Sequence, residues 1–236
     1  MRNSCSWALA AVSVSSALCG AAPAHAADAA AAPRALLVQA AYATSSKAAA
    51  LALIDRAAAI ATTELRQNGK DREAALQQAI ATGYKAKLTK SLGEAKLSKR
   101  LFETLAASDP NDPEAQVALA GWHLEAVHDV GAMIAGAMLG ARKKAGLVAL
   151  DRAVALGGGR ALFPGYAALL RIVLDSDDVA AARTLAERAA NGTALTPVDR
   201  IMKINAARLL VPLKAGDGRA AAKLAEQLLP FGRIAN

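Results

Sequence analysis

Cysteine is almost absent from this 236-residue chain, and its two copies, Cys5 and Cys19, lie close to the amino terminus. Residues 27–236 therefore contain no thiol. This excludes disulfides, zinc–thiolate sites, iron–sulfur clusters and a cysteine nucleophile from that part of the chain. The fold formed there has to be stable without a disulfide bond.

The first 26 residues have the three parts of a secretory signal peptide. Arg2 supplies a positive charge, residues 7–18 are apolar apart from small serines, and residues 24–26 read Ala-His-Ala. The apolar run is too short to span a bilayer as a stable helix. We expect cleavage after Ala26 and a periplasmic location in a bacterium, with release into the medium as the alternative.

Aromatic residues are also scarce, at 3% of the chain, although 54% of it is hydrophobic. Alanine supplies much of that fraction, and it favours helices while burying little area per residue. No second apolar run is long enough for a transmembrane segment. The net charge is +8, but so few aromatics are available to stack on bases that we expect no nucleic-acid partner.

The alternating pattern of β-strands is missing as well. Apolar residues instead recur at helical spacing, and glycine, asparagine, aspartate and proline separate the segments. The sequence therefore predicts an all-α protein. Residues 27–44 are expected to be an alanine-rich leader, either disordered or a frayed helix, and residues 45–236 a single helical-repeat domain. The predicted helices cover residues 46–67, 71–89, 93–107, 113–128, 130–139, 141–156, 160–175, 178–190, 196–214 and 218–232.

Residues 90–230 resemble the tetratricopeptide repeat, a helix–turn–helix unit of about 34 residues with small and large residues at set positions. The resemblance implies antiparallel helix pairs stacked as an α-solenoid, in which small residues let helices approach closely. Residues 128–142 exceed the standard repeat. The positions that carry the resemblance are Phe102 and Pro110 in one unit, Leu119 and Ala120 in the next, and Gly146, Leu150 and Ala153 in a third.

The segment 121–140 holds the most unusual group of side chains. Trp122, His123, Glu125 and His128 are the candidate residues for binding a ligand or a partner. The two histidines are five residues apart and do not share a helix face, so we expect no metal site. Glu125 and His128, three residues apart, are placed to pair on one face.

A stripe of small residues, Ala132, Gly136 and Gly140, follows in the same segment. Small residues every fourth position let a second helix come into close contact. The stripe is therefore a candidate helix-packing contact within the chain. The alternatives are a contact between subunits, so that a homo-oligomer is compatible with it, and a hairpin that touches lipid through Met133, Ile134, Met138 and Leu139.

No motif for catalysis accompanies these features. The chain has no nucleophile elbow, no phosphate-binding loop and no pair of carboxylates in an obvious cleft. We expect a protein that is not an enzyme and that needs no cofactor and no metal. The leading interpretation is an exported interaction scaffold that binds another envelope protein or a peptide. The alternative, a role found in a subgroup of exported proteins with such repeats, is an accessory component of a periplasmic solute-uptake system that binds a small molecule.

Overall fold

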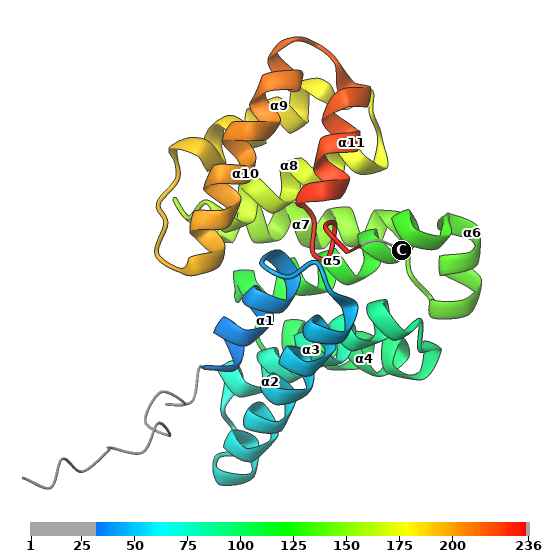
Figure 1. Ribbon diagram of the computed structural model, residues 1–236, viewed down its shortest axis with the longest axis vertical. Coiled ribbons are helices and arrows are strands. Elements are labelled where there is room, and N and C mark those ends of the chain that lie inside the picture. The colour runs from blue at the N-terminus through cyan, green and yellow to red at the C-terminus, as the bar shows by residue number, and fades with distance from the viewer. Residues whose placement is uncertain (1–31, 235–236) are drawn as a thin grey trace, which may run out of the picture. The chain divides into compact units, whose positions relative to one another are not determined.

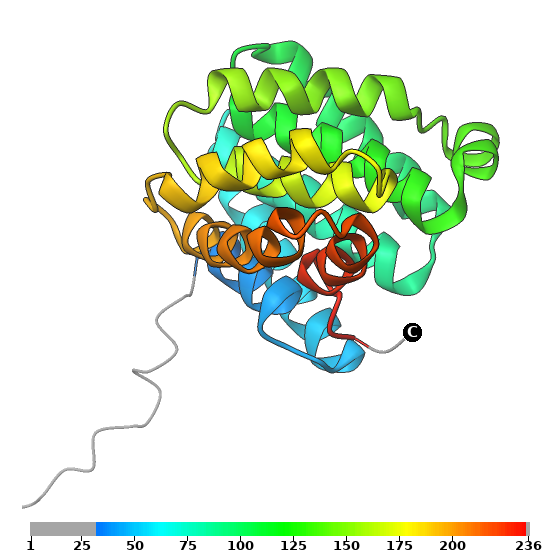
Figure 2. The ribbon, with the colours of Figure 1, turned by 90° about the horizontal axis from the view of Figure 1, so that it is seen from above.

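The computed structural model describes residues 32–234, and the predicted signal peptide with its two cysteines lies outside that range. All the regular elements in the described range are helices (Figures 1 and 2). The β-type pairing found there is an isolated bridge between Arg160 and Thr193. The predicted all-α class is confirmed. Within residues 32–234, no helix combines the length and apolar character needed to cross a membrane.

The elements largely follow the predicted segments. In chain order they are α1 (Pro33–Tyr42), α2 (Lys47–Gln67), α3 (Arg72–Thr89), α4 (Leu92–Ser108), α5 (Pro113–Val130), α6 (Ala132–Ile134), the π-helix η2 (Ala135–Leu139), α7 (Lys143–Leu156), α8 (Leu162–Leu174), α9 (Val179–Asn191), α10 (Pro197–Lys214) and α11 (Gly218–Leu228).

Of the two alternatives for residues 27–44, a disordered leader or a frayed helix, the structure has a helix, α1, over Pro33–Tyr42. Pro33 lies in the first turn, where its missing N–H leaves no hydrogen bond unmade. Leu36 and Leu37 are buried in a cluster with α2 and α3. The helix has only ten residues and follows an alanine-rich stretch, so its apolar periodicity is too short to separate it from a leader.

Polar caps explain why several helices begin where they do. A side-chain oxygen of the N-cap residue accepts a hydrogen bond from a backbone N–H of the first turn, which would otherwise lack a partner. The residues that cap in this way include Ser46, Asp71, Ser91, Asp112, Thr196 and Asp217.

Two predicted helices have different bounds in the structure. The segment 130–139 is interrupted at Gly131, where φ is 82°, and continues as the short α6 and the π-helix η2. The segment 218–232 ends as a helix at Leu228, because the chain then turns back. At Phe231, where φ is 65°, the backbone N–H donates to the Ala41 carbonyl at 2.8 Å.

Consecutive helices pack side by side through most of the chain, and α5 packs on α7 across the α6–η2 segment. Gly146 on α7 lies so close to α5 that an added Cβ would come within 2.6 Å of the Leu124 side chain. This agrees with the packing role expected for Gly146. Helix α8 is the most buried element and contacts α5, α7, α9, α10 and α11.

The two ends of the described chain meet. The tail after α11 reaches α1 through Phe231, whose ring also packs edge-to-face on Tyr84 of α3 at a centroid distance of 4.9 Å. Helix α1 contacts α10 as well. A pocket lies where α1, α3, α5 and α8 come together.

Candidate functional site

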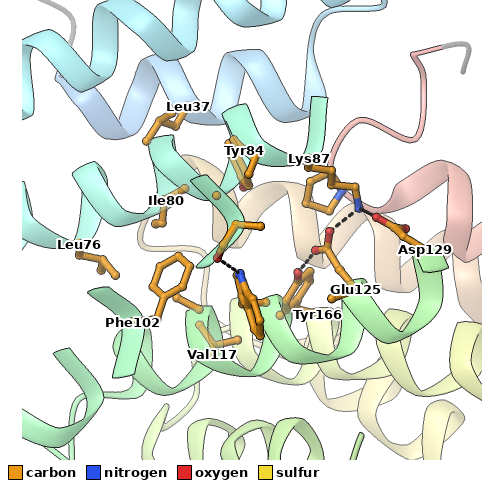
Figure 3. Close-up of a pocket in the computed structure, with 18 of the residues that line it drawn as sticks. Leu37, Leu76, Ile80, Tyr84, Lys87, Phe102, Val117, Glu125, Asp129 and Tyr166 are labelled. Carbon is orange, nitrogen blue, oxygen red and sulfur yellow. Dashed lines mark hydrogen bonds and ion pairs between the residues drawn. The ribbon is translucent and has the colours of Figure 1, made fainter. Parts of the chain in front are cut away.

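An elongated pocket of about 420 Å³ lies between α1, α3, α4, α5 and α8 (Figure 3). Its two long walls are α3, from Leu76 to Lys90, and α5, from Glu114 to Val130. At a rise of about 1.5 Å per residue, the lining part of each helix is roughly 20 Å long. The volume falls within the range of small-molecule sites.

The body of the pocket is apolar. Leu37 of α1, Ile80 of α3, Phe102 of α4 and Val117 of α5 line it, and Figure 3 shows Leu76 and Phe102 toward one end. These side chains offer dispersion contacts and no hydrogen bonds, so they suit a hydrocarbon or ring system rather than a sugar or a nucleotide.

The scarce aromatic residues are concentrated at this pocket. The chain contains three tyrosines, Tyr42, Tyr84 and Tyr166, and all three line it. Trp122 and Phe102 line it too. Five of the few aromatic residues in this chain therefore surround one space, each from a different helix.

A charged cluster lies at the end of the pocket nearest Val130. The Lys87 ammonium lies 2.5 Å from a Glu125 oxygen and 3.3 Å from an Asp129 oxygen. The Tyr166 hydroxyl donates a hydrogen bond to the other Glu125 oxygen (Figure 3). Burial lowers the pKa of Lys87, but the two carboxylates raise it by more, so the pKa lies above its ordinary value and the amine stays charged.

Gly121 makes room for Tyr166 in this cluster. A Cβ added at Gly121 would lie 2.7 Å from the Tyr166 hydroxyl oxygen. Any larger residue at this point of α5 would push the phenol away from Glu125, one turn further along the helix. The glycine therefore fixes the position of the tyrosine.

The other two tyrosines present neutral hydroxyl groups. Burial raises the pKa of Tyr42 and of Tyr84, and the charge of Glu125 raises both further, so both phenols stay protonated. Within residues 32–234, neither hydroxyl forms a hydrogen bond. Neither hydroxyl oxygen is among the fully buried polar atoms that lack a partner. Both are free to donate to a molecule in the pocket.

The opposite end of the pocket is closed by ion pairs. Arg34 of α1 lies 2.5 Å from Glu73 and 2.6 Å from Glu114. Arg160, before α8, bridges Glu114 at 2.7 Å and Asp199 of α10 at 3.2 Å. These contacts tie α1, α3, α5 and α10 together at this end of the pocket.

The predicted binding residues divide between two locations. Trp122 and Glu125 line the pocket, and the Trp122 indole N–H donates to the Ala95 carbonyl at 3.1 Å. His123 is buried on the other side of α5, where its Nδ1 accepts from the Arg142 backbone N–H at 3.3 Å. His128 does not line the pocket. The predicted pairing of Glu125 with His128 is wrong, because Lys87 and Tyr166 occupy the carboxylate.

The small-residue stripe does not form a packing face within the chain. Ala132 and Gly136 are exposed, and Gly140 is half-buried with φ at 69°. Ala135 is the residue that packs inward, against Val127 and Ala141. The break at Gly131 and the π-helix change the angular spacing that the stripe required, so the intramolecular prediction is wrong and the subunit contact stays a prediction.

Sequence reasoning missed Tyr42, Tyr84, Lys87 and Tyr166. They are spread over more than 120 positions and share no motif, so spacing alone could not bring them together. The signal that was present is compositional: all the tyrosines of a chain poor in aromatics serve one pocket. Among residues 32–234, no three histidine, cysteine or acidic side chains are grouped to hold a metal ion.

His123 should make stability depend on pH. Burial lowers the pKa of His123 from its ordinary 6.5, and the nearby Lys99 lowers it further. The unfolded chain then takes up a proton before the folded one does as the pH falls. The contribution of His123 to stability is therefore greatest above pH 6.5. It falls as the pH drops through that value toward the lowered pKa of the folded protein.

Urea unfolding followed by circular dichroism above and below this range measures the effect. His123→Asn keeps a hydrogen-bond acceptor for Arg142 and removes the titration, so its stability should vary less with pH than that of the wild type. An equal pH dependence in the two proteins would contradict the role assigned to His123.

Comparisons with known proteins add no family to this description. No protein-family model matches the sequence, and neither the curated proteins nor the solved structures contain a chain similar enough to match. The pocket itself is therefore the feature from which the function is inferred.

Proposed function

We propose that this protein binds an elongated, mostly apolar small molecule whose uncharged, oxygen-bearing head group lies beside Tyr42 and Tyr84. The observation that carries the proposal is the apolar pocket lined by all three tyrosines of the chain. Helices α3 and α5 provide the long walls, and the hydrocarbon part of the ligand lies along them. This develops the small-molecule alternative predicted from the sequence.

The charges around the pocket favour an uncharged head group. A carboxylate or phosphate would lie close to Glu125 and Asp129, and the one cation between them, Lys87, is already paired with both. A cationic head would have to lose its water and compete with Lys87 for the same carboxylates. A hydroxyl, ester or carbonyl oxygen needs only a donor, and the two free phenols supply it.

The proposal is binding without catalysis. The three tyrosines are held protonated by burial, and Glu125 is engaged by Lys87 and Tyr166, so neither kind of group is arranged to take a proton from a ligand. The same proposal includes three further predictions: the protein is exported, its helices stack as a solenoid, and it serves in solute uptake. The interaction scaffold for an envelope protein stays a prediction, since no surface contact tests it.

Trp122 provides the test. In a chain carrying Trp7→Phe it is the single tryptophan, and it lines the pocket. We expect dodecanol and monolaurin, added below their aggregation limits, to change its fluorescence saturably. Laurate and dodecylamine, with the same chain length and a charged head, should bind more weakly.

A matched variant tests the head-group contact. Tyr42→Phe combined with Tyr84→Phe keeps both rings and removes both hydroxyls, so the affinity for dodecanol should fall by about tenfold, the effect of one or two lost hydrogen bonds. A folded protein that responds to none of the four amphiphiles would overturn the function. Equal affinity for laurate and dodecanol would overturn the head-group assignment alone.

A further inference from the structure

Beyond the proposed function, the outer surface beside the pocket carries an unusual group of exposed apolar side chains. Met133 is 86% exposed, Ile134 54% and Met138 46%, all on the α6–η2 segment. Gly131 and Gly140, both with positive φ, bound this segment. It is held to the rest of the fold through Ala135 and Leu139, so its methionines and isoleucine face away from the core.

This surface continues into the mouth of the pocket. Val130, at the end of α5, and Leu92, at the start of α4, are exposed by 44% and 46%, and both also line the pocket. Leu139 of η2 lines it too. We use the name mouth patch for Leu92, Val130, Met133, Ile134 and Met138.

Positive charges are concentrated in the two segments that carry the mouth patch. Residues 90–103 and 128–144, which contain the patch, hold seven lysines and arginines and three carboxylates. Two of those carboxylates are already paired, Glu103 with Lys99 at 3.5 Å and Asp129 with Lys87 at 3.3 Å. The cations are Lys90, Lys96, Lys99, Arg100, Arg142, Lys143 and Lys144.

We propose that the mouth patch docks on an anionic lipid bilayer. Exposed methionine and isoleucine enter the boundary between head groups and acyl chains, while surrounding lysines and arginines pair with lipid phosphates. A second copy of this chain is a poorer occupant, because two such patches facing each other would bring together two sets of like charges. Docking would place the mouth of the pocket against the bilayer.

Vesicle flotation tests the docking. The probes are vesicles of phosphatidylcholine alone and of phosphatidylcholine mixed with phosphatidylglycerol, at low and at high salt. We expect the wild-type protein to float with the anionic vesicles and not with the neutral ones, and salt to weaken the binding by screening the charges.

Met133→Asp combined with Ile134→Asp should reduce binding to anionic vesicles by about tenfold or more, because both apolar contacts are lost and two negative charges are added. Both positions are exposed, so helicity should not change. The matched control is Ile204→Asp with Val211→Asp on α10, at side chains that are 61% and 73% exposed on a different helix. All variants carry the same amino terminus, so any contribution from it cancels.

Retained binding in the α10 control, with loss in the α6 variant, supports the proposal. Absence of wild-type binding to anionic vesicles, or equal loss in the two variants, overturns it. Sedimentation velocity tests the other possible occupant, a second copy of this chain. A wild-type dimer that the α6 variant converts to monomers would assign the patch to a subunit interface and would also overturn the proposal. None of these outcomes depends on whether the pocket binds a ligand.

Discussion

Asp199→Ala is expected to lower the free energy of unfolding by about 3–5 kcal/mol, because it leaves a paired arginine without its buried partner. Asp199 is fully buried, and one carboxylate satisfies three parts of the chain. It accepts from the Arg160 guanidinium at 3.2 Å, from the Leu162 backbone N–H at 3.1 Å and from the Thr196 backbone N–H at 2.9 Å. Helices α8 and α10 both begin at this carboxylate.

Urea unfolding by circular dichroism measures the loss. The matched control is Asp55→Ala. Asp55 is exposed, and its carboxylate pairs with the Lys85 ammonium at 2.8 Å. Exposed pairs of this kind contribute about 0–1 kcal/mol. If Asp199→Ala were no more destabilising than Asp55→Ala, the carboxylate would not be the link that we describe between α8 and α10.

Ala118→Phe should weaken ligand binding by roughly tenfold or more while leaving the fold intact, since the new ring occupies space that the ligand needs. Ala118 is half-buried and faces the pocket from the middle of α5. The pocket offers open volume at this point, so the phenylalanine fills space rather than displacing core side chains. Fluorescence titration of Trp122 with dodecanol measures the affinity.

Ala207→Phe provides the control, because Ala207 is exposed on α10 and does not line the pocket. Ala126→Phe, which enters the same pocket nearer its mouth, provides a second blocking variant should Ala118→Phe be poorly folded. Unchanged affinity in both folded blocking variants would show that the amphiphile binds elsewhere.

Asp199→Ala and Ala118→Phe test two parts of the same structure, the ion pairs at one end of the pocket and the open space inside it. The ion pairs of Arg34, Glu114, Arg160 and Asp199 tie helices together at one end of the pocket. The aromatic side chains and Lys87 then line the space that this connection leaves open. Because alanine-rich helices pack closely and fill little volume, a few large side chains decide where a cavity remains.

Some of the candidate site was accessible to sequence reasoning. Trp122 and Glu125 were selected because they stand together in an unusual segment, and both line the pocket. His123 was selected on the same ground and is a core residue, because it lies on the opposite face of α5. A list of unusual residues on one helix cannot say which face the neighbouring helices cover.

The sequence by itself determined the helices. Apolar residues at helical spacing and polar caps such as Ser91 and Thr196 are local features, and they specify where most helices begin and end. They do not specify α1, whose periodicity is short, or the interruption at Gly131, where a single glycine stands within an apolar run.

Only the tertiary structure decided the pocket. Tyr42, Tyr84 and Tyr166 come together because the tail after α11 returns to α1 and because α8 packs against α5. Those contacts join residues far apart in the chain, and they depend on the summed packing of many alanine-sized surfaces rather than on any motif. Local periodicity says which residues a helix must bury, but the partner that buries them is chosen by the whole fold.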